Sequence, residues 1–451
     1  MESPSSFGTR HFQVILIALA FFKNEWVILT VSSSTDGMYV TGGFKTMHEK
    51  FSSYSEQNLD WLMCPILFTG RLLGAIAPLF FCSKYIILVT SLVQSVALIA
   101  IPLLMTSQED LFKATLLVIE IVTIFQIPAA YTFMSRWTPH HELGKHMTVL
   151  STGTYFAFFT YVQIDSFFRM NYRVTYFLGG SLTLVWCFLW LVFSAPDPHK
   201  CFYISKEEQR YLFHNIPHIR KVAINVPVPL KKMLSCLPLY GFLLVDLSVE
   251  IYKISGRYYK LTNSFFMNIL HFQNAEGPQS IASMLIGDCF FIIIAGVITD
   301  RLIEKGVNLN NTRKSVSSIA LWGSGIAMAF LGYCTNHVNI RVAFNVSFYL
   351  RSLAIVGPIT VPFDISQNYG GFIIGISRTI STLLFPMVNN IERDILRRAI
   401  IKEVWDYYSY GTGGAIFVAN TIFLMCGDIY KRDFDTVGSY DWRHESIHSY
   451  P

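Results

Sequence analysis

The sequence predicts an all-α membrane protein of about twelve transmembrane helices in two six-helix halves. Three observations lead to this fold class. Hydrophobic residues make up 52% of the 451 residues and charged residues only 14%, whereas a soluble chain carries about 25% charged residues. The apolar residues are grouped into blocks of about 20, which is long enough for a helix to cross a bilayer. One long polar segment divides these blocks into two equal groups.

The expected spans follow the apolar blocks in chain order. In the first half we place them at 11–34, 59–82, 84–106, 110–134, 146–168 and 173–195. In the second half we place them at 235–262, 279–300, 315–334, 338–361, 370–391 and 412–430. The predicted domains are an N-terminal half over 1–195, a linker over 196–234, a C-terminal half over 235–430 and a tail over 431–451.

The distribution of lysine and arginine predicts the orientation. These residues are enriched in short cytoplasmic loops, and an arrangement with the N-terminus inside gives the inner loops the larger share of cations. We therefore expect an integral, multi-pass protein with both termini and the linker in the cytoplasm. Whether the membrane is the plasma membrane or a vesicular or lysosomal one stays open.

Several classes of function lack support in the sequence. The net charge of +5 is small and indicates no nucleic-acid partner. No G-x-x-x-x-G-K-[ST] loop for a nucleotide occurs, and His141 and His146 are five residues apart where a zinc-protease helix needs four. The eight cysteines include no C-x-x-C pair, so we expect buried free thiols. We predict no enzyme, no metal and no cofactor; a membrane enzyme is an alternative without a motif to support it.

A polar loop in the second half stands out, GVITDRLIEKGVNLNNTRKS over 296–315. A small residue at Gly296 permits close helix packing, and the charges of Asp300, Arg301 and Arg313 can pair and fix the loop between two helices. We assign these four residues a structural role.

This loop and three other stretches carry a family resemblance. The G-x-x-x-D-R pattern at 296–301 resembles the loop signature of the major facilitator superfamily. Within it, the chain resembles the organic anion and phosphate transporters that include sialin, the vesicular glutamate transporters and the sodium–phosphate cotransporters. The matching stretches are Ser135–Pro139 with Glu142, Pro196–His199 followed by Ile204–Tyr211, and Asp364–Gly371 followed by Gly375–Arg378.

The resemblance implies a monomeric secondary transporter of small organic or inorganic anions that works by alternating access. It implies a substrate site near the bilayer midplane between the halves, and coupling to H⁺ or Na⁺. The chain departs from the family at several charged positions. Trp26, Leu79, Leu116, Thr123, Tyr131 and Val249 stand where the family has arginine, aspartate, arginine, glutamate, histidine and arginine.

The candidate substrate-binding residues are Arg378, Arg351 and Tyr131. Arg378 lies in the middle of YGGFIIGISRTISTLLFPM, at a position where the family has asparagine, and Arg351 lies centrally in the tenth span. A guanidinium stays charged and can bind a carboxylate or phosphate through two parallel hydrogen bonds. The competing interpretation is that Arg378 only ties two helices together. Tyr131 is chosen for its aligned position.

The candidate ion-coupling residues are Glu120, Glu250, Lys253 and Asp288. Charged residues inside a membrane usually face the bundle interior and pair. Glu120 lies one turn before Thr123, while Asp246, Glu250 and Lys253 share one stripe of the seventh span, where a local ion pair is an equally good interpretation. We interpret Lys23 and Arg71 as span-end cations that extend to the bilayer surface.

The competing class of function is a non-transporting receptor, scaffold or degenerate paralogue built on a transporter fold. The substituted family positions support this alternative, and an uptake assay separates it from transport.

Overall fold

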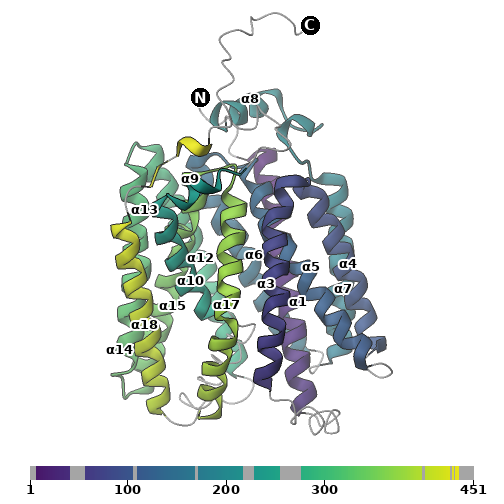
Figure 1. Cartoon of the computed structure of the whole chain (residues 1–451), viewed down its shortest axis with the longest axis vertical. Coiled ribbons are helices and arrows are strands. Elements are labelled where there is room, and N and C mark those ends of the chain that lie inside the picture. Colours follow the sequence, from purple (N-terminus) through teal and green to yellow (C-terminus); the bar gives the residue numbers. More distant parts are fainter. Residues whose placement is uncertain are drawn as a thin grey trace, which may run out of the picture.

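The computed structural model describes residues 7–40, 56–104, 109–167, 171–216, 228–253, 276–398, 402–426, 429–430 and 432–435. In these residues the regular secondary structure is entirely helical. Long helices run side by side, and the short helix α8 (Lys206–Asn215) lies across one end of the bundle (Figure 1). The prediction of an all-α protein is confirmed.

The long helices of the first half correspond to the six spans predicted there. They are α1 (Thr9–Val40), α3 (Glu56–Phe80), α4 (Ser83–Leu104), α5 (Glu109–Ser135), α6 (Leu143–Phe167) and α7 (Tyr172–Phe193), with the short η1 (His140–Glu142) before α6. The linker contains η2 (Pro198–Lys200), α8 and α9 (Leu230–Leu234).

The α-helices of the second half are more often interrupted by short helical turns. Its elements are α10 (Leu237–Lys253), α12 (Glu276–Glu304), α13 (Leu309–Ser317), η4 (Ser318–Trp322), α14 (Gly323–Leu331), α15 (His337–Ser352), η5 (Leu353–Ile355), η6 (Pro358–Thr360), α16 (Val361–Ile365), α17 (Gly370–Arg397), α18 (Lys402–Met425) and η7 (Asp433–Asp435).

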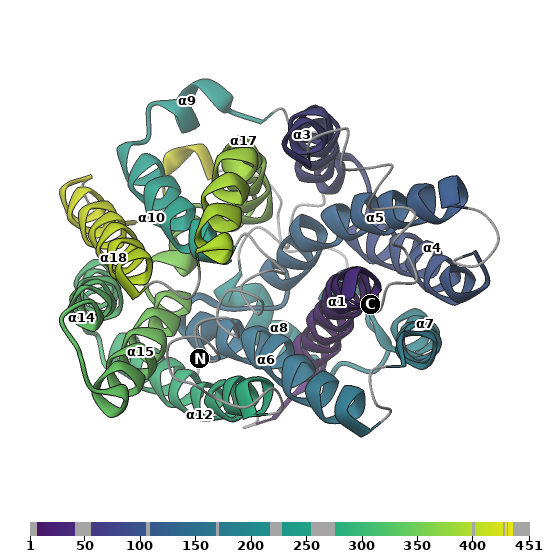
Figure 2. The same ribbon diagram turned by 90° about the horizontal axis from the view of Figure 1, so that it is seen from below.

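Viewed along the bundle, the helices form two groups (Figure 2). One group holds α1 and α3 to α7, and the other holds α10, α12, α14, α15, α17 and α18. The groups meet along two seams, where α17 packs on α3 and α5 and where α12 packs on α6. The predicted arrangement of two six-helix halves is therefore confirmed.

Two predicted spans are not single α-helices. The span predicted at 315–334 consists of α13, a π-helical turn at η4, and α14. The span predicted at 338–361 leaves α-helix after Ser352 and continues through two 3₁₀ turns, since Pro358 has no backbone N–H to donate. The span predicted at 235–262 is described only to Lys253.

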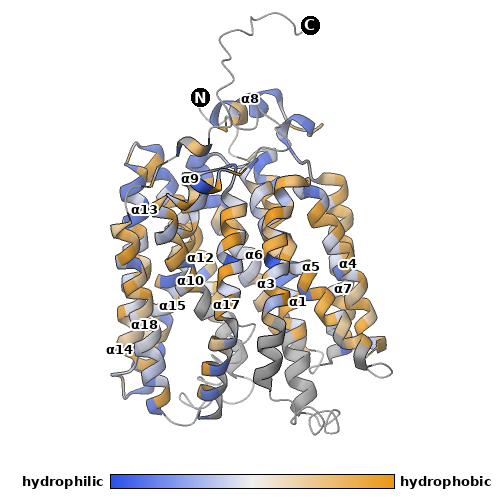
Figure 3. Cartoon of the chain, viewed as in Figure 1, coloured by the Kyte–Doolittle hydropathy of each residue, from blue (hydrophilic) through white to orange (hydrophobic). Residues whose placement is uncertain are grey.

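Seven described segments are long and apolar enough to cross a membrane, and three shorter apolar helices accompany them. The apolar residues form a broad band around the bundle, with polar residues gathered at the α8 end (Figure 3). The long helices α6 and α18 fall outside this group of ten. The chain is a multi-pass integral membrane protein.

The eight cysteines are free, as predicted, and all except Cys82 are buried.

Candidate functional site

Arg378 is the centre of the candidate site. It lies on α17, and its Nη2 is 3.2 Å from Oδ1 of Asp246 on α10, with the two side chains 17% and 1% exposed. The hydroxyl of Ser377 donates to the other carboxylate oxygen of Asp246. The pair thus joins two helices of the second half, and the side chain of Arg378 stays partly exposed.

The first half contributes two side chains beside Arg378. Arg71 on α3 donates from Nη1 to the backbone carbonyl oxygen of Arg378 at 3.0 Å. Tyr131 on α5 lies between Phe21 of α1 and Phe363 of α16, with ring centroids 5.7 and 5.8 Å away. Tyr131 also lies within the electrostatic reach of Arg378 and Asp246. Two of the predicted substrate-binding residues therefore lie together at the boundary between the halves.

Two glycines of α17 permit this close approach. A Cβ added to Gly375 would lie 2.5 Å from Cβ of Ala75 on α3, and one added to Gly371 would lie 2.7 Å from the carbonyl oxygen of Pro128 on α5. Such distances are shorter than van der Waals contact, so only glycine fits at this separation. The glycine-rich start of α17 brings Arg378 against the first half.

Arg351 and Asp288 belong to a second group with different contacts. Asp288 of α12 is fully buried and accepts a hydrogen bond from Ser352 of α15. Arg351 lies over the ring of Phe348, 5.3 Å from its centroid. Tyr155 of α6 lies within reach of the charges of both Asp288 and Arg351. The predicted ligand Arg351 is thus grouped with a predicted coupling acid at the seam between α6 and the second half.

Lys23 corrects one interpretation of the sequence. It lies near the middle of α1, is 3% exposed, and does not extend to the bilayer surface. Its ammonium donates to the amide oxygens of Gln126, Asn24 and Gln94 at 2.7, 2.8 and 2.9 Å. It also faces the ring of Trp186, 5.1 Å from the centroid. The amides at positions 94 and 126, inside apolar spans, were the sequence signal for this buried cation.

Arg71 is likewise not a span-end residue. It lies in the apolar segment Cys64–Phe80 of α3 and contacts α17 instead of the bilayer surface. The charges of Glu120 and Arg378 both act on it. Sequence reasoning missed this residue as a member of the site.

The remaining predicted coupling residues are placed as follows. Glu120 of α5 is exposed and lies within electrostatic reach of Arg71. The side chains of Glu250 and Lys253 lie outside the described residues, although their backbone continues α10.

The loop signature fixes helix ends at the α8 end of the bundle. The carboxylate of Asp300 on α12 accepts hydrogen bonds from the backbone N–H groups of Gly144 and Lys145, at 2.9 and 2.8 Å. These N–H groups lie at the start of α6 and have no carbonyl partner within that helix. A negative charge is stabilising at this end of a helix. Gly296 permits the approach, because a Cβ there would lie 3.0 Å from the carbonyl oxygen of Gly144.

Arg313 and Arg301 differ sharply in environment. Arg313 is fully buried and donates from Nε to Asp364 at 2.8 Å and from Nη1 to the carbonyl oxygen of Val356 at 2.8 Å. It thereby holds the 3₁₀ turns after α15 against α13. Arg301 is exposed.

An ion-pair network joins the linker to the first half. Arg10 of α1 donates to Glu142 of η1 at 2.7 and 3.0 Å and to Glu208 of α8 at 3.0 Å. Burial favours a neutral Glu142, but the bonds and charge of Arg10 outweigh it and hold the pKa of this carboxyl below its usual value. Glu208 also accepts the backbone N–H groups of Thr9 and Arg10, so the linker caps α1.

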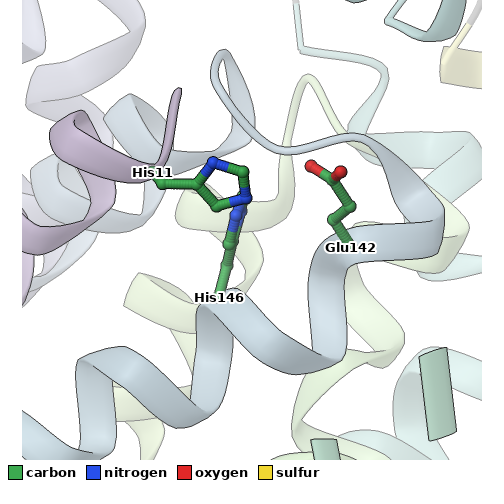
Figure 4. Close-up of side chains that lie close together, drawn as sticks. All are labelled: His11, Glu142 and His146. Atoms are coloured by element: carbon green, nitrogen blue, oxygen red, sulfur yellow. The ribbon is translucent and has the colours of Figure 1, made fainter. Parts of the chain in front are cut away.

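One group among the described residues has the composition of a metal site: His11, Glu142 and His146, whose candidate ligand atoms lie within 4.8 Å of one another (Figure 4). Its hydrogen bonds do not favour a metal. Nδ1 of His11 accepts from the N–H of Gly8 at 3.0 Å, which puts the proton of a neutral ring on Nε2. Arg10 already engages both oxygens of Glu142. The group is better explained as a polar contact between helix ends.

The geometry defines a helical membrane protein of two halves, with charged side chains such as Arg378 and Asp246 near the boundary between them. The sequence model of the Major Facilitator Superfamily matches residues 26–387, and the chain belongs to this family. The solved structure of the proton:xylose symporter XylE has the same fold, with a TM-score of 0.63 and 11% identity over 92% of this chain and 94% of that one.

The relatives that match by sequence align with only part of this chain. The chloroplastic ascorbate transporter of Arabidopsis thaliana is 22% identical over 57% of this chain and 47% of its own length. Human sialin is 22% identical over 57% of this chain and 52% of its own. Human sodium-dependent phosphate transport protein 4 is 22% identical over 59% and 63%. The matches span about half the length of these relatives.

Proposed function

We propose that this protein is a secondary transporter of small organic or inorganic anions that works as a monomer by alternating access. The observation that carries the proposal is the partly exposed side chain of Arg378 at the boundary between the halves. Similarity to transporters of ascorbate and phosphate supports the anion class. The expected orientation places both termini in the cytoplasm.

In this proposal Arg378 binds the anion and Tyr131 shapes the site from the other half. A guanidinium stays charged and presents its N–H donors in a planar fork that suits a carboxylate or phosphate group. Rocking of the two halves would open the boundary to one side of the membrane and then to the other. Glu120 and Asp288 are the proposed coupling acids.

The test is uptake into proteoliposomes under imposed proton, sodium or voltage gradients, with phosphate, ascorbate and a panel of other anions. We expect gradient-driven uptake by wild type and altered anion selectivity for Arg378→Asn, with the exposed Arg398, which follows α17, replaced by glutamine as the control. Unchanged transport by Arg378→Asn would remove Arg378 from the site. Failure of wild type to move any anion would favour the receptor or scaffold alternative.

A further inference from the structure

The chain after α18 folds back onto the second half. Residues 429–430 and 432–435, here called the strap, lie beyond the end of α18 and contact the loop 366–369 between α16 and α17. The backbone N–H of Arg432 donates to the carbonyl oxygen of Ile365 at 3.1 Å. The backbone N–H of Ile429 donates to the side-chain oxygen of Asn310 on α13, also at 3.1 Å. The strap therefore joins α13 to the end of α16.

Asp435 makes the main polar contact of the strap. It is 2% exposed, and one of its carboxylate oxygens accepts hydrogen bonds from the hydroxyl of Ser366 at 2.5 Å and from the backbone N–H of Asn368 at 3.2 Å. Its backbone carbonyl oxygen accepts from Nδ2 of Asn368 at 3.0 Å. These groups directly precede the first turn of α17, where a negative charge is stabilising.

Other side chains of the strap are anchored in the protein. Ile429 is 2% exposed and belongs to the buried apolar core, and Phe434 packs against that core. The guanidinium of Arg432 acts on the thiol of Cys236 both through its charge and as a hydrogen-bond partner. Cys236 directly precedes α10 and is 7% exposed. The reactivity of this thiol therefore reports whether the strap is docked.

The loop that the strap holds also contacts the first half. Nε2 of Gln367 donates to the carbonyl oxygen of Thr138 at 3.3 Å, and Nδ1 of His140 lies 3.8 Å from a carboxylate oxygen of Asp364. α17 then begins and packs closely on α5 at Gly371. The short stretch 364–371 is therefore in contact with the strap and with the first half at once.

The polar groups of this loop depend on the strap. Ile365 and Ser366 are fully buried, and a buried polar group left without a partner is costly. Among the described residues, the strap provides the donor for the carbonyl oxygen of Ile365 and the acceptor for the hydroxyl of Ser366 and the N–H of Asn368. Undocking of the strap removes all three partners, so the loop is no longer held in the arrangement that contacts Thr138.

We propose that the strap regulates closure of the boundary between the halves at the α8 end. Docked, it holds the loop 366–369 and the start of α17 against the first half; undocked, it lets the boundary open at that end. Asp435 is a positioning residue that acts through α17. The inference rests on the proposed function only for the opening and closing of the boundary. Its test measures structure and not uptake, so the two proposals can fail separately.

The first measurement is the rate at which a maleimide modifies Cys236 in the purified full chain in detergent, assigned by mass spectrometry of peptides. Asp435→Ala removes the carboxylate, whereas Asp435→Asn keeps an oxygen for Ser366 and Asn368. We expect Asp435→Ala to raise the rate at least about tenfold and Asp435→Asn to stay within about threefold of wild type. The control Asp394→Asn changes an exposed acid near the other end of α17 and should match wild type.

The second measurement is the distance between two spin labels, attached to cysteines that replace Lys200 and Lys305. Both lysines are exposed; Lys200 lies in η2 of the linker, and Lys305 directly follows α12 of the second half. Cys82 and Cys236 are replaced by serine in this chain. We expect one distance population for wild type and for Asp435→Asn, and an additional population at longer distance for Asp435→Ala.

Each outcome supports or overturns the proposal. If Cys236 of Asp435→Ala reacts at the wild-type rate, Asp435 does not hold the strap. If it reacts faster but the spin-label distances are unchanged, the strap only caps α17 and its role in closure is refuted. Cys187 of α7 is 3% exposed, so its modification marks global unfolding. Ser366→Ala breaks the same contact from the loop and replaces Asp435→Ala in both measurements if that variant unfolds.

Discussion

Lys23 in the first half and Arg378 in the second are both cations in the middle of long helices, but their surroundings differ. Arg378 pairs with the carboxylate of Asp246 and stays 17% exposed. Lys23 is 3% exposed and is held by the neutral amide oxygens of Gln94, Gln126 and Asn24. Lys23 is therefore solvated by amide dipoles, whereas Arg378 is paired with an opposite charge.

Replacing these two cations should change the stability of the protein by different amounts. Removing one partner of a buried ion pair leaves an uncompensated charge. Removing a cation from a set of amides leaves groups that can hydrogen-bond to one another. Two matched substitutions to methionine, which preserves length and removes charge, test this contrast.

The largest effect is expected for Arg378→Met. Among the described residues, the substitution leaves the carboxylate of Asp246, which is 1% exposed, with the hydroxyl of Ser377 as its partner. We expect the free energy of unfolding, measured by denaturant titration in mixed micelles, to fall by about 3 kcal/mol. A loss below about 0.5 kcal/mol would show that the ion pair contributes no net stability.

A double-mutant cycle sharpens the same contrast. Asp246→Asn keeps an acceptor for Ser377 and removes the charge, so the double variant Asp246→Asn with Arg378→Met has no unpaired charge at this place. We expect the double variant to be more stable than Arg378→Met alone, with an interaction energy of about 1–3 kcal/mol. Additive effects would contradict a direct pairing of these two side chains.

The fold could be predicted from local pattern, because each span is an apolar block whose length matches the bilayer. The chain interruptions inside spans were not predictable in the same way. The turns after Ser352 depend on Arg313 of another helix, which donates to the carbonyl oxygen of Val356. A pattern within one span does not reveal a partner that lies 43 residues away.

The contacts within the candidate site also could not be predicted from local spacing. Asp246 was placed on a stripe with Glu250 and Lys253 by the local i, i+4 rule, and its ion-pair partner in the structure is Arg378 of α17. The interpretation of Lys23 as a span-end cation was wrong, because this residue lies near the middle both of the predicted span 11–34 and of α1. Sequence spacing identified charged residues correctly but not which of them meet.

The smallest effect is expected for Lys23→Met. The ammonium gives up three hydrogen bonds, but burying it is itself unfavourable, and Nε2 of Gln126 already lies 3.4 Å from Oε1 of Gln94. The two amides can therefore bond to each other once the lysine is gone, which limits the change in the free energy of unfolding to within about 1 kcal/mol. The same denaturant titration measures it beside Arg378→Met. If Lys23→Met were as destabilising as Arg378→Met, amide dipoles would be as effective as a carboxylate in stabilising a cation here, and the contrast between these two sites would disappear.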